Sequence, residues 1–180
     1  MKIQYSYLKN FLQTKLSQKK LVDVFTQVGF ECEIDGDLIE FDITPNRGDV
    51  LSLKGLEREF CAYKVKKSKN RLETFALKLN NDNQIINQID HAGCGNYHLM
   101  LIEGLRKIKN LDVKKLSFIA SAGVPLIHPL VDLGNYVMLE VGAPMHVFDL
   151  DKLELPINVK FPKSNKNSLE VIGGDVKDVQ

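Results

Sequence analysis

The sequence predicts an α+β fold, in which helices and strands mix without a regular strand–helix–strand order. Apolar residues recur at helical spacing in residues 17–29, whereas they alternate with polar residues in residues 38–44. Farther along the chain, apolar strand-like runs and one helical pattern follow each other irregularly. A parallel sheet built from repeated strand–helix units is therefore not favoured.

The first strong pattern is a helix in residues 17–29, preceded by a shorter apolar element in residues 7–12. Ser17 is a suitable N-cap because its hydroxyl accepts a hydrogen bond from the first turn, and Gly29 ends the helix because it adopts positive φ without cost. Four apolar residues at positions i, i+3, i+4 and i+7 share one face of this helix: Leu21, Val24, Phe25 and Val28.

Residues 38–44 predict a half-buried strand that is followed by a tight turn. Ile39, Phe41 and Ile43 face one side. The other side carries Leu38, Glu40 and Asp42. Residues 44–49 contain Pro, Asn and Gly, which break the alternation. A second helix follows, whose predicted buried stripe is Leu53, Leu56, Phe60 and Tyr63.

The turn contains four residues of structural interest: Pro45, Asn46, Arg47 and Asp49. Proline fixes φ, and an aspartate at the end of the turn is expected to cap the next helix. Arg47 is interpreted either as a surface residue or as a clamp on a neighbouring carboxylate or phosphate.

A basic segment divides the chain. Five of the eight residues in 64–71 are basic, which favours a solvated linker, with phosphate contact as the alternative. We place the linker at residues 67–72, between a small helix–strand–helix unit at residues 1–66 and a mixed α/β domain at residues 73–180. The second domain is expected to contain strands near 75–79, 97–103, 135–141 and 155–161, a polar turn at 80–83 and a helix at 113–122.

Composition excludes several classes of protein. A net charge of +1 argues against a surface built wholly for nucleic acid. No apolar run approaches the ~18–20 residues that span a bilayer, and neither terminus carries a signal-peptide or lipidation pattern. The three cysteines and four histidines lack metal-ligand spacing, so no metal site is expected. The common phosphate-loop, dinucleotide, zinc-protease and serine-hydrolase motifs are absent.

Polar groups interrupt an apolar segment at residues 131–149, which is expected to form a strand, a turn and a second strand. Asn135 and His146 are candidates to face a ligand ester or carbonyl, because loops on rigid supports often carry function. A lone histidine is more often a packed, hydrogen-bonded side chain. Asp149 is expected either to hold His146 in one tautomer or to cap a turn.

Both motifs resemble one family, the β subunits of bacterial-type phenylalanyl-tRNA synthetase. Residues 42–49, Asp-Ile-Thr-Pro-Asn-Arg-Gly-Asp, are similar to the family's N-terminal domain, and residues 131–149 are similar to its editing-domain signature. The opening residues 7–8 and 28–33 also fit. The resemblance implies a partial editing domain at 73–180 and, near residues 34–37, a tight loop where the family carries a tRNA-binding OB domain.

The resemblance implies a function in phenylalanine–tRNA ligation. The α subunit performs aminoacylation with ATP and Mg²⁺, and the β subunit supports assembly and binding of tRNA(Phe). The β subunit also edits tyrosine that was attached to this tRNA in error. This chain is then a cytoplasmic partner of the α subunit that itself needs no cofactor, with no membrane or DNA partner. A stand-alone binding module and a free deacylase of mischarged tRNA are the alternatives.

By position, Asn135 and His146 match residues that line the family's editing pocket. Gly134 stands where the family usually has Thr, which removes a hydroxyl able to bind substrate or orient water. Ala143 replaces the usual Gln of the turn, and residues 95–96, Gly-Asn, replace a typical Pro-Arg. The candidate pocket therefore comprises Gly134, Asn135 and His146.

Overall fold

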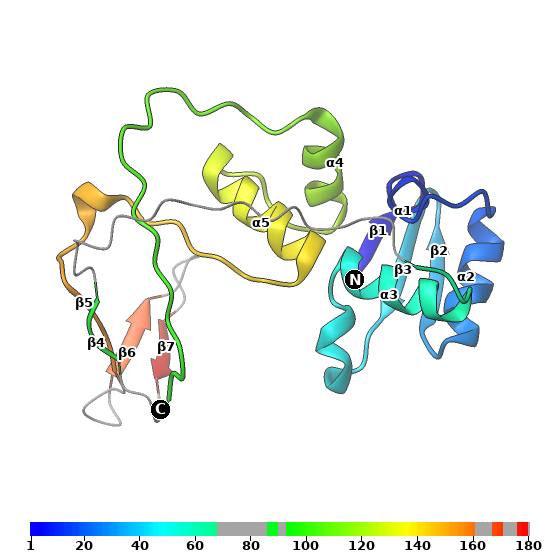
Figure 1. The fold of residues 1–180 in the computed structure, drawn as a ribbon, viewed down its shortest axis with the longest axis horizontal. Coiled ribbons are helices and arrows are strands. Elements are labelled where there is room, and N and C mark those ends of the chain that lie inside the picture. The colour runs from blue at the N-terminus through cyan, green and yellow to red at the C-terminus, as the bar shows by residue number, and fades with distance from the viewer. Residues whose placement is uncertain (68–85, 90–92, 161–166, 171–175, 180) are drawn as a thin grey trace. The chain divides into compact units, whose positions relative to one another are not determined.

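The computed structural model describes residues 1–67, 86–89, 93–160, 167–170 and 176–179 (Figure 1). Its internal contacts group the chain into two compact units. Unit 1 comprises Met1–Thr74 and Arg106–Val147, and unit 2 comprises Phe75–Leu105 and Phe148–Gln180. Unit 1 thus includes residues that we assigned by sequence to the second domain. The limits 1–66, 67–72 and 73–180 remain a prediction, since the linker lies largely outside the described residues.

Unit 1 contains an antiparallel sheet of β1 (Lys2–Gln4), β2 (Glu31–Asp35) and β3 (Leu38–Asp42). The strand order is β1-β3-β2, so the strand that the sequence predicts best occupies the centre. β2 and β3 are joined by a two-residue turn in which Gly36 has φ +58°. The tight connection predicted near residues 34–37 is confirmed, but Ile34 and Asp35 belong to β2 and only Gly36 and Asp37 form the turn.

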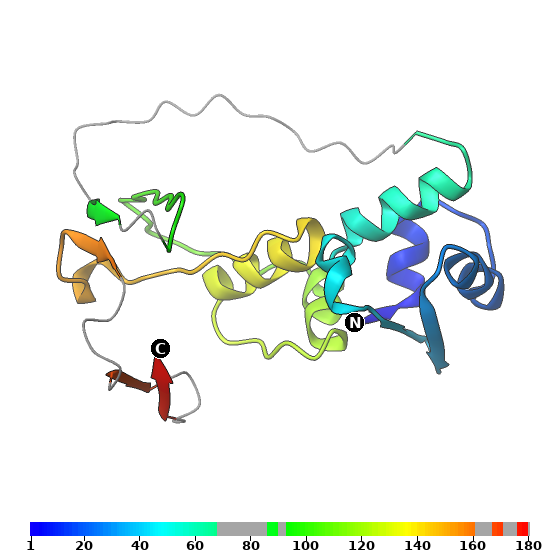
Figure 2. The same cartoon turned by 90° about the horizontal axis from the view of Figure 1, so that it is seen from below.

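Three helices, α1 (Tyr5–Phe11), α2 (Gln18–Gln27) and α3 (Leu53–Tyr63), pack beside this sheet (Figures 1 and 2). Their shared core is aromatic at its centre. The Phe25 ring meets the Phe41 ring edge-on, with centroids 5.0 Å apart, and lies 6.2 Å from the Phe60 ring. One side chain of α2 thereby contacts both the central strand and α3.

The predicted limits of α2 are confirmed. Ser17 precedes the helix and its hydroxyl accepts a hydrogen bond from the Lys20 amide, while Gly29 follows it with φ +99°. In α3, Leu53, Leu56 and Phe60 are buried as predicted, but Tyr63 is exposed.

Asp49 does not cap α3, contrary to our prediction. The turn continues as a 3-10 helix, η1 (Pro45–Val50), and Ser52 caps α3 by accepting a hydrogen bond of 3.1 Å from the Gly55 amide. Asp49 lies inside η1, so its carboxylate is three residues too early to cap α3. Arg47 is a clamp on carboxylates: it binds Asp49 at 2.9 Å and Glu59 at 3.0 Å.

Two further helices of unit 1 are α4 (Val113–Ser121) and α5 (Pro129–Val141). α4 confirms the helix predicted at residues 113–122. It begins after Asp112, whose carboxylate accepts from the Lys115 amide, and it is followed by Gly123 with φ +80°. α5 occupies a segment for which we predicted a strand.

In unit 2, β4 (Ile86–Ile89) pairs in parallel with β5 (Ile157–Val159), and β6 (Asn167–Glu170) pairs antiparallel with β7 (Val176–Val179). A short 3-10 helix, η2 (Leu150–Lys152), precedes β5. β5 confirms part of the strand predicted at 155–161.

The strand predicted at residues 97–103 is wrong, because that segment has no ladder partner among the described residues. The strand and turn predicted at 75–79 and 80–83 lie outside the described residues.

The fold class predicted from sequence, α+β, is confirmed by these helices and by the antiparallel sheet of unit 1. Within the described part of the chain, no helix is both long and apolar enough to cross a membrane. Nor do three or more His, Cys, Asp or Glu side chains there form a group suited to a metal ion.

We predict that Gly55→Ala destabilises unit 1 by about 1–3 kcal/mol, the usual range for overpacking. A Cβ at Gly55 would collide with the Asp49 carbonyl oxygen and would lie 2.6 Å from the Val50 Cα, so η1 or α3 must move. Urea denaturation followed by circular dichroism measures the effect. Gly48→Ala is the matched control, because a Cβ there meets nothing within 4 Å; equal losses in both variants would contradict the prediction.

Candidate functional site

The helix α5 carries two of the three candidate pocket residues. It begins after His128, whose Nδ1 accepts a hydrogen bond of 3.3 Å from the Leu130 amide, with Pro129 at the first helical position. It ends at Gly142, which has φ +82°. The strand predicted at residues 135–141 is therefore wrong.

The signal for this helix was present in the sequence. Proline at the first helical position and glycine after the last are the usual limits of a helix. Asp132, Tyr136 and Leu139 are buried at positions i, i+4 and i+7. That spacing is helical, but the apolar run around it is also typical of a buried strand.

The candidate residues lie on two adjacent segments of unit 1. Gly134 is buried in α5, and Asn135 follows it with a half-buried side chain. His146 is exposed in the extended segment after α5. A Cβ built on Gly134 would lie 3.8 Å from the carbonyl oxygen of Met145. The helical turn that holds Gly134 and Asn135 therefore runs beside the residue preceding His146.

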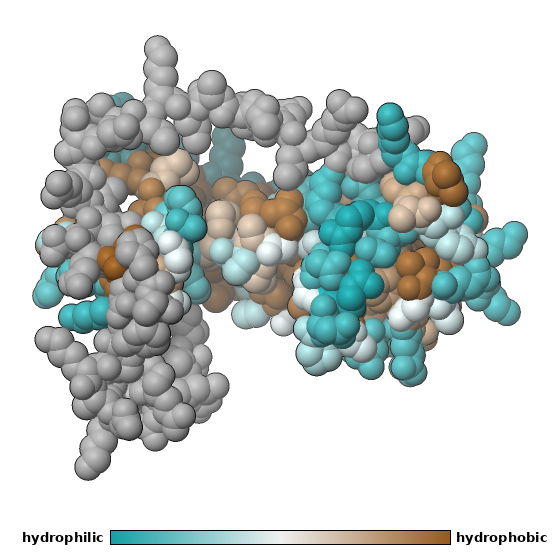
Figure 3. Space-filling view, turned by 60° about the horizontal axis from the view of Figure 1, so that its bottom comes forward, coloured by the Kyte–Doolittle hydropathy of each residue, from teal (hydrophilic) through white to brown (hydrophobic). Residues whose placement is uncertain are grey.

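Asp149 performs the capping role that we considered for it. Its Oδ1 accepts a hydrogen bond of 3.2 Å from the Asp151 amide at the start of η2, and its other oxygen lies 3.7 Å from the Lys152 ammonium. Large hydrophobic side chains are exposed around α5 and the segment that follows it (Figure 3). They are Leu126, Ile127, Leu133, Met145 and Val147.

An aromatic cluster holds α5 against the N-terminal helices. The Tyr7 hydroxyl of α1 donates to the Tyr136 hydroxyl of α5 at 3.3 Å. The Tyr7 ring stacks on Phe118 of α4, with centroids 4.4 Å apart and planes 6° from parallel, and Phe118 meets Tyr136 edge-on at 6.4 Å. The Lys115 ammonium lies 5.5 Å from the centre of the Tyr136 ring. Sequence reasoning missed these residues, because their contact joins positions 129 residues apart.

The two ends of α5 are also fixed. The buried Asp132 carboxylate accepts a hydrogen bond of 2.9 Å from the Ile127 amide, which ties the preceding loop to the helix. At the other end, a Cβ on Gly142 would lie 3.4 Å from the Ser52 side chain, the cap of α3. The orientation of α5, which carries Gly134 and Asn135, is therefore fixed by its contacts with the rest of unit 1.

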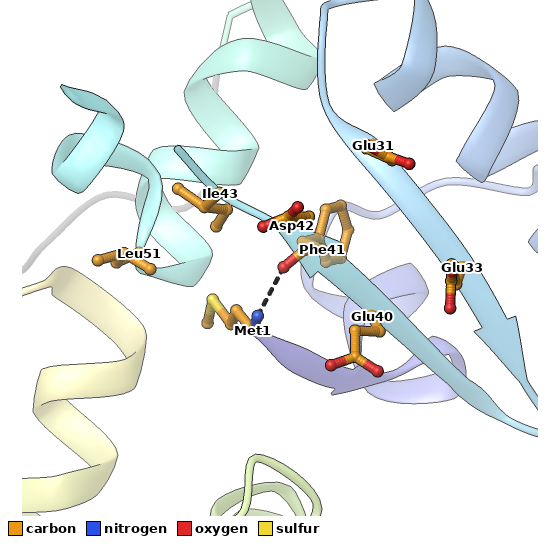
Figure 4. Close-up of a pocket in the computed structure, with 8 residues that line it drawn as sticks. All are labelled: Met1, Glu31, Glu33, Glu40, Phe41, Asp42, Ile43 and Leu51. Atoms are coloured by element: carbon orange, nitrogen blue, oxygen red, sulfur yellow. Dashed lines mark hydrogen bonds between the residues drawn. The ribbon is translucent and has the colours of Figure 1, made fainter. Parts of the chain in front are cut away.

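A separate hollow of about 450 Å³ lies on the exposed face of the sheet (Figure 4). Four of its eight lining residues are acidic, and the Met1 ammonium donates to the Phe41 carbonyl oxygen at 2.6 Å. Glu31 lies opposite Asp42, and Glu33 opposite Glu40. Like charges placed directly across two strands are destabilising, and charges on an edge strand such as β2 oppose pairing with another chain. The lining residues are Met1, Glu31, Glu33, Glu40, Phe41, Asp42, Ile43 and Leu51.

Comparison with known proteins shows which families the chain and its candidate site are similar to. Residues 93–179, which include α5 and all three candidate residues, match the B3/4 domain family. Phenylalanine–tRNA ligase β subunits are similar over most of the chain. The protein from Francisella tularensis subsp. tularensis is 34% identical over 143 residues, or 79% of this chain and 18% of that relative. The one from Aquifex aeolicus is 36% identical over 138 residues, or 76% of this chain and 17% of the relative.

The chain is a relative of the phenylalanine–tRNA ligase β subunits. The resemblance that the motifs suggested is therefore confirmed. The chain spans 18% of the length of the Legionella pneumophila (strain Paris) β subunit, to which it is 35% identical.

The chain is also similar to a crystal structure of an N-terminal fragment of the phenylalanyl-tRNA synthetase β subunit from Pyrococcus horikoshii. The alignment covers 99% of this chain and 50% of that fragment, with a TM-score of 0.43 and 17% identity.

The hydrogen-bonded pair Tyr7 and Tyr136 predicts how the stability of the chain changes at high pH. Burial raises the pKa of Tyr7 and, together with the hydrogen bond from Tyr7, raises the pKa of Tyr136. A raised folded-state pKa means that the stabilisation is complete below the unfolded value, about 10, and is lost as pH rises through the folded values.

We expect the free energy of unfolding to fall above pH 10, and to fall less steeply in Tyr136→Phe. Urea denaturation at pH 8–11 measures both slopes, with Tyr63→Phe as the control for an exposed tyrosine. Identical slopes for the wild type and Tyr136→Phe would contradict this expectation.

Proposed function

We propose that the chain acts as part of the β subunit of a phenylalanine–tRNA ligase and supports the synthesis of phenylalanyl-tRNA. The observation that carries this proposal is the 34–36% identity to such subunits over about three quarters or more of the chain. The proposed partners are the α subunit and tRNA(Phe), in the cytoplasm. Aminoacylation belongs to the α subunit, which uses ATP and Mg²⁺.

Purification of the native complex tests this proposal. We expect an antibody against the chain to recover the α subunit from source-cell extract, and the recovered complex to attach phenylalanine to tRNA. An immunoblot of the same sample gives the mass of the native product that carries these residues. Recovery of the chain without the α subunit and without ligase activity would refute the proposal and favour a stand-alone binding module.

The second candidate function is editing, the hydrolysis of tyrosine from mischarged tRNA(Phe). It is supported by the contact that brings the Gly134–Asn135 turn beside the segment of His146. The chemical need is general. Tyrosine differs from phenylalanine by one hydroxyl, and an apolar pocket rejects an added hydroxyl only weakly, by a factor of about 10². A second site that accepts the hydroxyl corrects the error.

Asn135 and His146 have groups suited to this reaction. An amide side chain donates to a carbonyl oxygen, and an imidazole accepts or donates a proton near neutral pH. In the proposed site, Asn135 orients the ester carbonyl and His146 orients the attacking water or the terminal ribose. Gly134 supplies no hydroxyl, so water at this position is held by fewer groups.

Release of tyrosine from Tyr-tRNA(Phe) by the full 180-residue chain tests the editing candidate. We expect His146→Ala to slow release at least tenfold, whereas His98→Ala, at an exposed histidine of unit 2, leaves it unchanged. Gly134→Thr restores a hydroxyl and is expected to raise the rate relative to Gly134→Ala, which adds only the Cβ. A rate that His146→Ala does not alter would remove this residue from the mechanism.

A further inference from the structure

One side of the helix α5 contacts α1 and α4, and another side carries Gly134 and Asn135 of the candidate pocket. Tyr136 is directed at Tyr7 and Phe118, and it is buried. The preceding residues, Gly134 and Asn135, lie near the segment that leads to His146. In an α-helix, successive residues are rotated by 100° and rise 1.5 Å, so fixing one side chain fixes the orientation of its neighbours.

We infer that Tyr7 and Tyr136 are positioning residues of the editing site, through which α1 sets the orientation of the Gly134–Asn135 turn. This inference rests on the editing activity proposed above. In this role the two tyrosines act through α5 and do not bind substrate. Their hydroxyl–hydroxyl hydrogen bond is partly buried. Phe118 packs on both rings, and Lys115 lies over the ring of Tyr136. A partly buried hydrogen bond between rigid rings fixes both direction and distance, which apolar packing alone does not.

The hydrogen bond between the two hydroxyls is the polar contact of this cluster that crosses from α1 to α5. Loss of the Tyr7 hydroxyl removes the hydrogen bond that joins α5 to α1, whereas Tyr136 keeps its side-chain hydrogen bond with Glu140 of its own helix. α5 is then held to α1 by ring packing alone and is expected to rotate or to open locally more often. The Gly134–Asn135 turn moves with it, because both residues lie within one helical turn of Tyr136.

Amide hydrogen exchange of the full chain tests whether the Tyr7–Tyr136 hydrogen bond holds α5 in place, without any assay of activity. We expect Tyr7→Phe and Tyr136→Phe to raise the exchange rate of residues 129–141 about fivefold, the effect of losing one ordinary hydrogen bond. The double variant should exchange no faster than the faster single variant, because both changes remove the same bond. Exchange of β3 should stay unchanged in all three.

Tyr5→Phe is the matched control. It removes a tyrosine hydroxyl from the same helix, α1, where the hydroxyl donates to the Leu16 carbonyl oxygen at 2.8 Å instead of to α5. Unaltered exchange of α5 in Tyr7→Phe would overturn the inference. So would an equal acceleration of α5 in Tyr5→Phe, because the effect would then be a general loss of stability.

Tyrosine release from Tyr-tRNA(Phe) tests the positioning role. We expect Tyr7→Phe and Tyr136→Phe to lower kcat about fivefold with KM unchanged, since neither side chain binds the tRNA. A rise in KM with unchanged kcat would overturn the role. A wild-type chain that releases no tyrosine would refute the editing activity and the positioning role together. The exchange experiment would still show whether the Tyr7–Tyr136 hydrogen bond holds α5 in place.

Discussion

Packing around Phe25 is the constraint on which the rest of unit 1 depends. This ring joins α2 to the central strand through Phe41 and to α3 through Phe60. The position of α3 in turn fixes Ser52, whose hydroxyl caps α3 and whose side chain lies 3.4 Å from where a Cβ on Gly142 would stand. The end of α5 is thus located by contacts that begin in the N-terminal core.

Local sequence patterns were sufficient to predict an element where one of its faces is buried and where capping residues mark its ends. α2 has both features, with Ser17 and Gly29 at its limits, and β3 alternates cleanly because its two faces differ. β1 was missed because three residues carry too short a pattern. The cap of α3 was misassigned to Asp49 because a turn and a 3-10 helix have the same composition.

Elements that depend on distant partners were harder to predict. The strand expected at residues 97–103 needs a neighbour to bind its backbone groups, and apolar content alone does not supply one. α5 was predicted as a strand because Val137, Met138 and Leu139 suit either state. The candidate residues themselves came from resemblance to a family. Their proximity to Met145 and the support from Tyr7 required the three-dimensional structure, since those contacts join residues far apart in sequence.

Two glycines show how differently the same residue is constrained. At Gly55 a Cβ would collide with the backbone of η1, so packing alone requires glycine. At Gly134 a Cβ would meet only the Met145 carbonyl oxygen, at an ordinary contact distance of 3.8 Å. Glycine in a helix interior is less stable than alanine by about 0.5–1 kcal/mol, so neither packing nor helix stability accounts for Gly134. What distinguishes this position is its place beside Asn135 and the His146 segment, where the presence or absence of a side-chain hydroxyl changes the chemistry of the candidate pocket.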